Sequence, residues 1–295
     1  MTKVAKNSNK LSLKCNKWQN LTFYYLKTSI NSKYKILLYL CLQIGSMLKA
    51  ERKEAILSQV ELHNRVLLAD LAETLDVSID TARRDVKELD ADGKLRKVHG
   101  GAVSLGFNSL VARNVNVFAL EEKQLIAEKA LDLLREGSVI FIDGGTTCLE
   151  FARMIPVDLS LTCFTFSIPV AHVLMTKPNI ETIFIGGKID PEAQITIGLE
   201  TARQFSEIQV DFSFIGTGYV DPVHGLTDLS WDVVQIKKAV INASKKSVLL
   251  CISQKLNSHH RYKTCDLSAI HTMITELDPT HNRLNLFRES DIHLL

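Results

Sequence analysis

A loop rich in glycine and threonine follows a short apolar segment near the middle of the chain. Val139–Ile142 is apolar, Asp143-Gly144-Gly145-Thr146-Thr147 comes next, and a helical pattern runs from Leu149 to Met154. Amides at the start of a helix bind anions, so this loop predicts a phosphate site. The hydroxyls of Thr146 and Thr147 would donate hydrogen bonds, whereas Asp143 suits sugar hydroxyls better than a phosphate. A simple turn is the alternative interpretation.

Four further apolar segments also end in small or polar residues. They span 161–165, 180–185, 210–215 and 248–252, and helical patterns lie between most of them. This alternation predicts a largely parallel α/β sheet covered on both faces. Ligands collect at the carboxyl ends of such strands, so we expect one ligand-binding rim there. Its expected members beyond the first loop are Thr165, Ser167, Gly186, Gly187, Gly216, Thr217, Gly218, Asp228, Lys237 and Lys255.

Two lysines of this set would carry the positive charge of the rim. Lys237 and Lys255 are the expected partners of a phosphate or carboxylate, although either could be an ordinary surface lysine. Gly216-Thr217-Gly218 lacks the third glycine of a dinucleotide fingerprint, so no cofactor is expected. The basic loop His259-His260-Arg261 supplies too few ligands for a metal site.

Composition limits the class of protein without identifying it. The chain has 295 residues, 46% hydrophobic and 23% charged, which is ordinary for a globular protein of two domains. Its six cysteines form no CxxC pair, which fits a reducing cytoplasm and predicts no structural metal. The net charge of +2 is uneven: residues 1–46 hold eight lysines and no acid, while residues 47–105 hold ten basic and eleven acidic residues.

The first 46 residues are interpreted apart from the rest. Their apolar run, 36–44, is about half the length that a membrane helix needs. A secretory signal is a weaker alternative, because its charged flank is normally short and a cleavage site should follow. We expect a disordered leader or a misassigned start, with Met47 as the initiator.

Residues 51–92 carry three helical patterns in the order of a helix-turn-helix. Apolar residues recur over 51–62 and again over 68–75, and Asp76-Val77-Ser78 separates the second pattern from the third. Ser78 is expected to cap the third helix, 79–92. The residues expected on the inner face of that helix are Ile79, Ala82, Val86 and Leu89.

The third helix and the basic segment after it supply the candidate DNA contacts. The segment 94–99 alternates like a strand, and the following glycines permit a tight turn into 102–103, which predicts a β-wing along DNA phosphates. Arginine can read guanine edges or clamp phosphates. A solvated helix face is the alternative. The expected DNA-binding residues are Ser78, Asp80, Thr81, Arg83, Arg84, Lys87, Lys94, Arg96, Lys97, His99, Gly100 and Gly101.

These residues resemble the signature of the DeoR family of bacterial transcriptional repressors. The pattern V-S-x-x-T-x-R-R-D-x-x-x-L, closing on H-G-G-A, matches residues 77–89 and 99–102. The resemblance covers nearly all of 48–295. It implies a C-terminal sugar-phosphate sensor, related in fold to ribose-5-phosphate isomerase and coenzyme A transferases, whose effector pocket includes the D-x-G-T-T segment. Phe166 and Ile252 depart from the family, which usually has Asn and Asp there.

Residues and resemblance together predict a two-domain regulator. We expect a winged helix-turn-helix domain over 47–105, a linker over 106–120, and an α/β sensor and oligomerisation domain over 121–295. The protein would act as a homo-oligomeric repressor of sugar metabolism genes that binds an operator in double-stranded DNA and a phosphorylated sugar, without membrane attachment and without enzymatic activity. The alternative is a sugar-phosphate isomerase carrying a DNA-binding head, for which Asp143, Asp228 and Lys237 are the acid-base candidates.

Overall fold

The computed structural model describes residues 48–105 and 117–295, and the residues from 53 onwards belong to one compact unit. The predicted leader, the proposed start at Met47 and most of the predicted linker lie outside the described residues. Below, residues 53–105 are called the head and residues 117–295 the α/β part. Among the described residues, none of the helices is long and apolar enough to cross a membrane.

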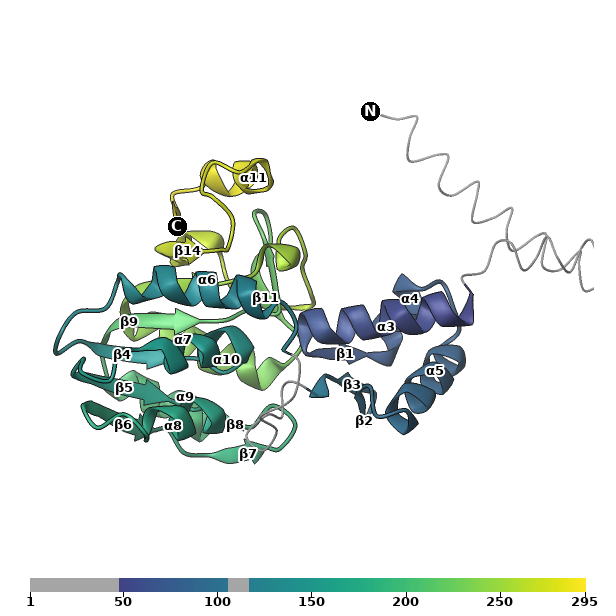
Figure 1. Ribbon diagram of the computed structural model, residues 1–295, viewed down its shortest axis with the longest axis horizontal. Coiled ribbons are helices and arrows are strands. Elements are labelled where there is room, and N and C mark those ends of the chain that lie inside the picture. Colours follow the sequence, from purple (N-terminus) through teal and green to yellow (C-terminus); the bar gives the residue numbers. More distant parts are fainter. Residues whose placement is uncertain (1–47, 106–116) are drawn as a thin grey trace, which may run out of the picture. The chain divides into compact units, whose positions relative to one another are not determined.

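The head contains three helices and a small antiparallel sheet (Figure 1). Its core is formed by Ile56 and Val60 of the first helix with Ala82, Val86 and Leu89 of the third, all fully buried. The strand order is β1-β3-β2, so the predicted wing is confirmed. The elements are α3 (Lys49–His63), β1 (Arg65–Leu67), α4 (Leu68–Thr74), α5 (Ile79–Ala91), β2 (Arg96–Val98) and β3 (Gly101–Val103).

One inward position of the third helix was predicted wrongly. Ile79 is 44% exposed. It is the first residue of α5, directly after the Ser78 cap, where no neighbouring turn covers it. Strand β1 was not predicted either, because three residues are too short to show alternation.

Seven parallel strands form the sheet of the α/β part, in the order β15-β14-β12-β9-β4-β5-β6. The five predicted strands are confirmed, but the last of them starts earlier: it pairs with β9 from Ser244 and ends at Leu250. The strands are β4 (Val139–Ile142), β5 (Leu161–Thr165), β6 (Ile180–Phe184), β9 (Val210–Ile215), β12 (Ser244–Leu250), β14 (Thr272–Ile274) and β15 (His293–Leu294).

Helices cover both faces of this sheet, as predicted. Successive residues of β4 point to opposite faces: Ile140 and Ile142 pack with α6, α7 and α8, whereas Phe141 packs with Phe205 and α10. Leu125 of α6 points away from this packing and is 47% exposed. The helices are α6 (Leu120–Leu131), α7 (Thr146–Met154), α8 (Ile168–Leu174), α9 (Leu199–Gln204), α10 (Trp231–Asn242) and α11 (Asn285–Arg288).

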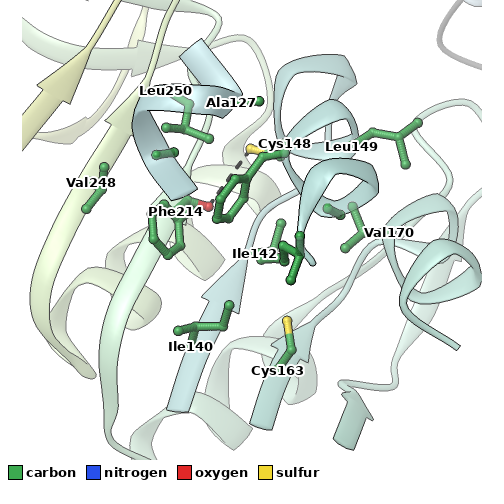
Figure 2. Packing of buried hydrophobic residues seen from close by; sticks show 14 of the residues in the cluster. Ala127, Ile140, Ile142, Cys148, Leu149, Cys163, Val170, Phe214, Val248 and Leu250 are labelled. Carbon is green, nitrogen blue, oxygen red and sulfur yellow. Dashed lines mark hydrogen bonds between the residues drawn. The ribbon is translucent and has the colours of Figure 1, made fainter. Parts of the chain in front are cut away.

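On the face of the sheet that contains Ile140 and Ile142, packing fixes the start of α7 above the strands. Cys148 of α7 lies over Phe214 of β9, and its thiol donates to the carbonyl O of Phe214 at 3.9 Å (Figure 2). Phe151, one turn further, packs on the same ring at a centroid distance of 4.4 Å. The thiols of Cys148, Cys163, Cys251 and Cys265 are free.

Short elements that the sequence did not predict complete the α/β part. A hairpin is formed by β7 and β8, and a second antiparallel sheet has the order β10-β11-β13. They are β7 (Lys188–Asp190), β8 (Ile195–Ile197), β10 (Tyr219–Asp221), β11 (Gly225–Asp228) and β13 (Tyr262–Cys265), with the 3-10 turns η2 (Phe205–Glu207), η3 (Ser253–Lys255), η4 (Leu267–Ala269) and η5 (Asn282–Leu284).

Candidate DNA-reading surface and effector pocket

The start of α5 is held by a side-chain cap. The Oγ of Ser78 accepts a hydrogen bond from the backbone N of Thr81 at 3.1 Å and lies 2.9 Å from its Oγ1. The predicted cap is therefore confirmed. Both hydroxyls are engaged with each other, so their first role is to set the helix, and contact with a DNA phosphate would be additional.

The outer face of α5 carries exposed cations. Arg83, Arg84 and Lys87 are all exposed. Arg83 pairs with Asp80 one turn earlier, and both side chains are more than half exposed. An exposed pair of this kind contributes little to stability, so Arg83 can leave Asp80 for a stronger anion at small cost.

The wing lies beside α5 and adds further cations. Lys94, Lys97 and His99 are exposed, and the backbone N of Lys97 donates to Oδ1 of Asp90 in α5 at 2.8 Å. Arg96 differs from the expectation: its Nε and Nη2 are buried and have no hydrogen-bond partner among the described residues. Arg96 as a whole is half-buried, so it is less accessible to DNA than the exposed cations of the wing.

The two glycines of the wing have backbone roles. Gly100 is exposed in a turn with φ +74°, and its carbonyl O accepts from the backbone N of Leu68 at 2.8 Å. Gly101 is buried, and a Cβ there would lie 2.1 Å from the carbonyl O of Val66. The close packing of β3 on β1 thus requires glycine at this position.

A cavity of about 140 Å³ opens at the carboxyl ends of β4 and β9. A cavity of this size holds a small molecule rather than a single water. Most of the predicted rim residues line it: Asp143, Gly144, Gly145, Thr146, Thr147, Gly216, Thr217, Gly218, Asp228, Lys237 and Lys255.

Four predicted rim residues do not line this cavity and have structural roles instead. The Oγ1 of Thr165 donates to the carbonyl O of Ile142 at 2.7 Å, and Ser167 caps α8. The carbonyl O of Gly186 accepts from Thr201, and a Cβ at Gly187 would lie 2.0 Å from Oγ1 of Thr201.

The first turn of α7 faces the cavity with uncapped amides. Gly145 is the N-cap residue, with φ +95°, and it has no side chain to accept from the first amides of the helix. Those amides have no acceptor within the helix. The hydroxyls of Thr146 and Thr147 lie in the same turn. This combination of amides, helix dipole and hydroxyls suits a phosphate.

Lys237 forms a closed charge cluster at the base of the cavity. Its Nζ lies 3.3 Å from Oδ2 of Asp143 and 3.3 Å from Oδ2 of Asp228, and it donates to the carbonyl O of Gly216 at 2.9 Å. Burial opposes the charged lysine, but the two carboxylates raise the pKa of Lys237. Asp143 also accepts from the backbone N of Gly144 and Gly216, at 2.7 and 2.9 Å.

Lys255 is the more available cation of the cavity. In the part of the chain that the structure describes, its Nζ donates to the carbonyl O of Thr217 at 2.9 Å and makes no ion pair. Burial lowers the pKa of Lys255, and the charge of Lys237 acts in the same direction. An incoming anion would relieve both effects.

Several cavity residues were missed by sequence reasoning. The β7–β8 hairpin contributes Asp190, Glu192 and Ile195, and β10 contributes Tyr219. The head contributes His63, Asn64, Arg65 and Val103. No local motif marks these positions, because each reaches the cavity only through the tertiary fold.

The two departures from the family pattern have different positions. Phe166 is fully buried and lines the cavity, where its ring stacks on Phe141 at 5.7 Å. A position where the family usually has Asn is therefore apolar in the lining of this cavity. Ile252 is buried in the apolar cluster below α6 and α7 and is not a lining residue.

Comparisons with known proteins cover both parts of the chain. Residues 52–106 match the DeoR-like helix-turn-helix domain, and residues 119–277 match the DeoR C terminal sensor domain. The chain is 30% identical over 253 residues to the transcriptional repressor GlcR of Bacillus subtilis, which covers 84% of this chain and 96% of the relative. It is 27% identical over 255 residues to the glycerol-3-phosphate regulon repressor of Escherichia coli, covering 84% and 99%.

Among solved structures, the probable sor operon regulator of Shigella flexneri is 11% identical, with a TM-score of 0.34 over 46% of this chain and 76% of that chain.

A further relative by sequence is an uncharacterized HTH-type transcriptional regulator of Haemophilus influenzae. It is 30% identical over 250 residues, covering 84% of this chain and 97% of the relative. The chain belongs to the DeoR family of DNA-binding transcriptional regulators.

Proposed function

We propose that the protein is a repressor of sugar or polyol metabolism genes. Its affinity for DNA is controlled by a small phosphorylated sugar or polyol that binds in the α/β part. The observation that carries the proposal is the first turn of α7, which has no side-chain cap and lines the cavity together with the half-buried Lys255. The relatives include two repressors: the glycerol-3-phosphate regulon repressor of Escherichia coli and GlcR of Bacillus subtilis. The first of these supports this ligand class.

DNA binding is assigned to α5 and the wing. Arg83, Arg84 and Lys87 on α5 would enter the major groove, and Lys94, Lys97 and His99 of the wing would contact phosphates. We further propose that the active form is a homo-oligomer, because two reading heads are needed to bind two half-sites of an operator.

Within the pocket, the phosphate would bind the first amides of α7, the hydroxyls of Thr146 and Thr147, and Nζ of Lys255. Lys237 serves a different purpose from the one expected, because two carboxylates already neutralise it. The closed cluster holds the loops that contain Asp143 and Gly216 in place. It also supports a regulatory rather than an enzymatic role, since no carboxylate of the cluster is left free to act as a general base.

A thermal-shift screen tests the ligand. The panel contains sn-glycerol 3-phosphate, pentose and hexose phosphates, their unphosphorylated counterparts and inorganic phosphate. At a concentration 100-fold above Kd, binding adds about 2.7 kcal/mol of stability, which raises the Tm by several degrees. Lys255→Ala should abolish the shift, whereas Lys238→Ala, an exposed lysine of α10, should retain it. A wild-type protein that responds to no phosphorylated compound contradicts the proposal.

The DNA assignment is tested with sequences that the wild-type protein selects from a random pool. Arg84→Ala should weaken binding to the selected site about 5- to 100-fold, as expected for loss of one arginine contact to a base. Lys238→Ala again serves as the charge-matched control. Equal affinity of the Arg84 and wild-type proteins would remove Arg84 from the reading surface.

A further inference from the structure

The end of helix α3 in the head forms part of the wall of the cavity. His63, the last residue of α3, donates through Nδ1 to the carbonyl O of Gly218 at 3.1 Å. Its ring stacks on Tyr219 at a centroid distance of 4.2 Å and an interplanar angle of 16°. Gly218 and Tyr219 follow β9 and line the cavity themselves. A ligand beside them would therefore lie near a residue of the head.

The head also reaches a second wall. Asn64 adopts φ +62°, which turns the chain out of α3 into β1. Arg65 then lies 3.7 Å from Glu192 and 4.0 Å from Asp190, both on the β7–β8 hairpin. The hairpin contributes Asp190 and Glu192 to the cavity. Two separate walls of the cavity therefore contact the head, one through His63 and the other through Arg65.

A third connection reaches the DNA-binding helices directly. Asp70 in α4 accepts from Nε2 of His260 at 2.9 Å and from Arg261 at 3.3 Å. The ring of His260 lies 5.1 Å from that of Tyr219. A continuous series of contacts thus runs from Tyr219 at the cavity to α4, whose residues pack in one core with α5.

We infer that the head is one wall of the effector pocket, and that His63 couples ligand binding to the position of the DNA-reading helix. The inference rests on the proposed function of this pocket. A ligand that fills the space between Gly218, the hairpin and α7 must either bind beside His63 in its present position or displace the His63 side chain. The same ligand therefore acts on the head directly, without a relay through the sheet.

The chemistry of His63 fits a ligand that also carries hydroxyl groups. Burial, with the nearby charge of Lys255, lowers the pKa of His63 to about 4, so the ring is neutral at physiological pH. Since Nδ1 carries the proton donated to Gly218, Nε2 is an acceptor. A hydroxyl can donate to such an acceptor, whereas a phosphate dianion cannot.

Three variants test this coupling in the full-length protein: His63→Ala, His63→Gln and the control Glu54→Ala, which alters an exposed residue of the same helix. The probes are sn-glycerol 3-phosphate and inorganic phosphate, with affinity measured by calorimetry and backbone exchange of residues 60–70 by hydrogen–deuterium exchange. Wild type and Glu54→Ala should show ligand-dependent exchange over 63–67. His63→Ala and His63→Gln should lose this response, and His63→Ala should bind sn-glycerol 3-phosphate about 5- to 10-fold more weakly, as for loss of about one hydrogen bond.

The outcomes separate this inference from the proposed function. If wild type binds a probe and the His63 variants bind equally well with an unchanged exchange response, the coupling is wrong and the proposed ligand class stands. If wild type binds neither these probes nor the wider panel, the proposed function fails first. In that case Tyr219→Leu without ligand decides whether the contact itself exists: exchange over 63–67 should rise, and an unchanged rate overturns the inference.

Discussion

Lys237 and Lys255 are two lysines of one cavity, but their electrostatic surroundings differ. Lys237 is compensated by Asp143 and Asp228. Among the described residues, Nζ of Lys255 makes no ion pair and donates to the carbonyl O of Thr217 at 2.9 Å. A buried charge that is fully paired belongs to the scaffold, and a less compensated one favours an incoming anion. The sequence marked both lysines as anion partners, because the spacing along the chain does not show which carboxylates lie near each ammonium group.

Removing the Lys237 ammonium should therefore damage the fold more than the ligand chemistry. Lys237→Ala leaves the buried carboxylate of Asp143 without its countercharge, and the loss is expected to be about 3–5 kcal/mol in the free energy of unfolding. Urea unfolding of Lys237→Ala and Lys255→Ala provides the comparison. Lys255→Ala should lower the free energy of unfolding much less, because it leaves no buried carboxylate without a countercharge. Equal destabilisation by the two variants would contradict this division of roles.

At the scale of single elements, the wing depends on one close backbone approach. Gly101→Ala would place a Cβ 2.1 Å from the carbonyl O of Val66. Because backbone atoms form the obstacle, β1 and β3 must separate, and we expect the head to unfold locally and specific DNA binding to be lost. Gly186→Ala is the matched control, since a Cβ there meets nothing within 4 Å. DNA binding and the helical signal in far-ultraviolet circular dichroism report the result, and a fully active Gly101 variant would show that β1 and β3 tolerate the separation.

The stability of the folded chain should depend on pH through His63, the α3 residue that contacts the cavity wall. The pKa of His63 falls from 6.5 to about 4 on folding. Between these values the unfolded chain binds the proton and the folded chain does not, so stability falls as pH is lowered from 6.5 to 4. The groups that act on His63 are Lys255, His260 and Asp228.

His63→Gln removes this titration and should flatten the pH dependence of the unfolding free energy by about 2–3 kcal/mol across that window. The quantity measured is the difference between wild type and variant in urea unfolding at pH 4 to 7, which cancels the titration of other groups. Parallel curves for the two proteins would mean that His63 is not held as a neutral ring.

The elements differ in how well the sequence predicts them. Buried parallel strands are short, mainly apolar segments, so 139–142, 161–165 and 210–215 were located to the residue. The hairpin and the small sheet consist of strands of three or four residues, which have no measurable period. His63 could not be assigned to the cavity, because its hydrogen-bond partner Gly218 lies 155 residues further along the chain.

On the scale of the whole molecule, the head contributes both to the cavity wall and to DNA binding. The effect of the ligand on DNA binding must therefore equal the effect of DNA on ligand binding. If the ligand prefers one position of the head and DNA prefers another, each must weaken the binding of the other by the same factor. Ordinary allosteric coupling of about 1–3 kcal/mol corresponds to a 5- to 150-fold change. The same factor should therefore appear when the experiment is run in either direction.

We expect the ligand that gives the largest thermal shift to weaken binding to the selected DNA site, and the DNA to weaken binding of that ligand equally. Fluorescence anisotropy of labelled DNA gives the first factor and calorimetry gives the second, at one salt concentration because phosphate contacts are salt-dependent. His63→Gln should reduce both factors towards one while it retains DNA binding without ligand, since α5 and the wing are unchanged. Two unequal factors in wild type would indicate a linked equilibrium beyond the two sites, such as subunit assembly, whereas undiminished coupling in His63→Gln would show that the signal reaches α5 by another path.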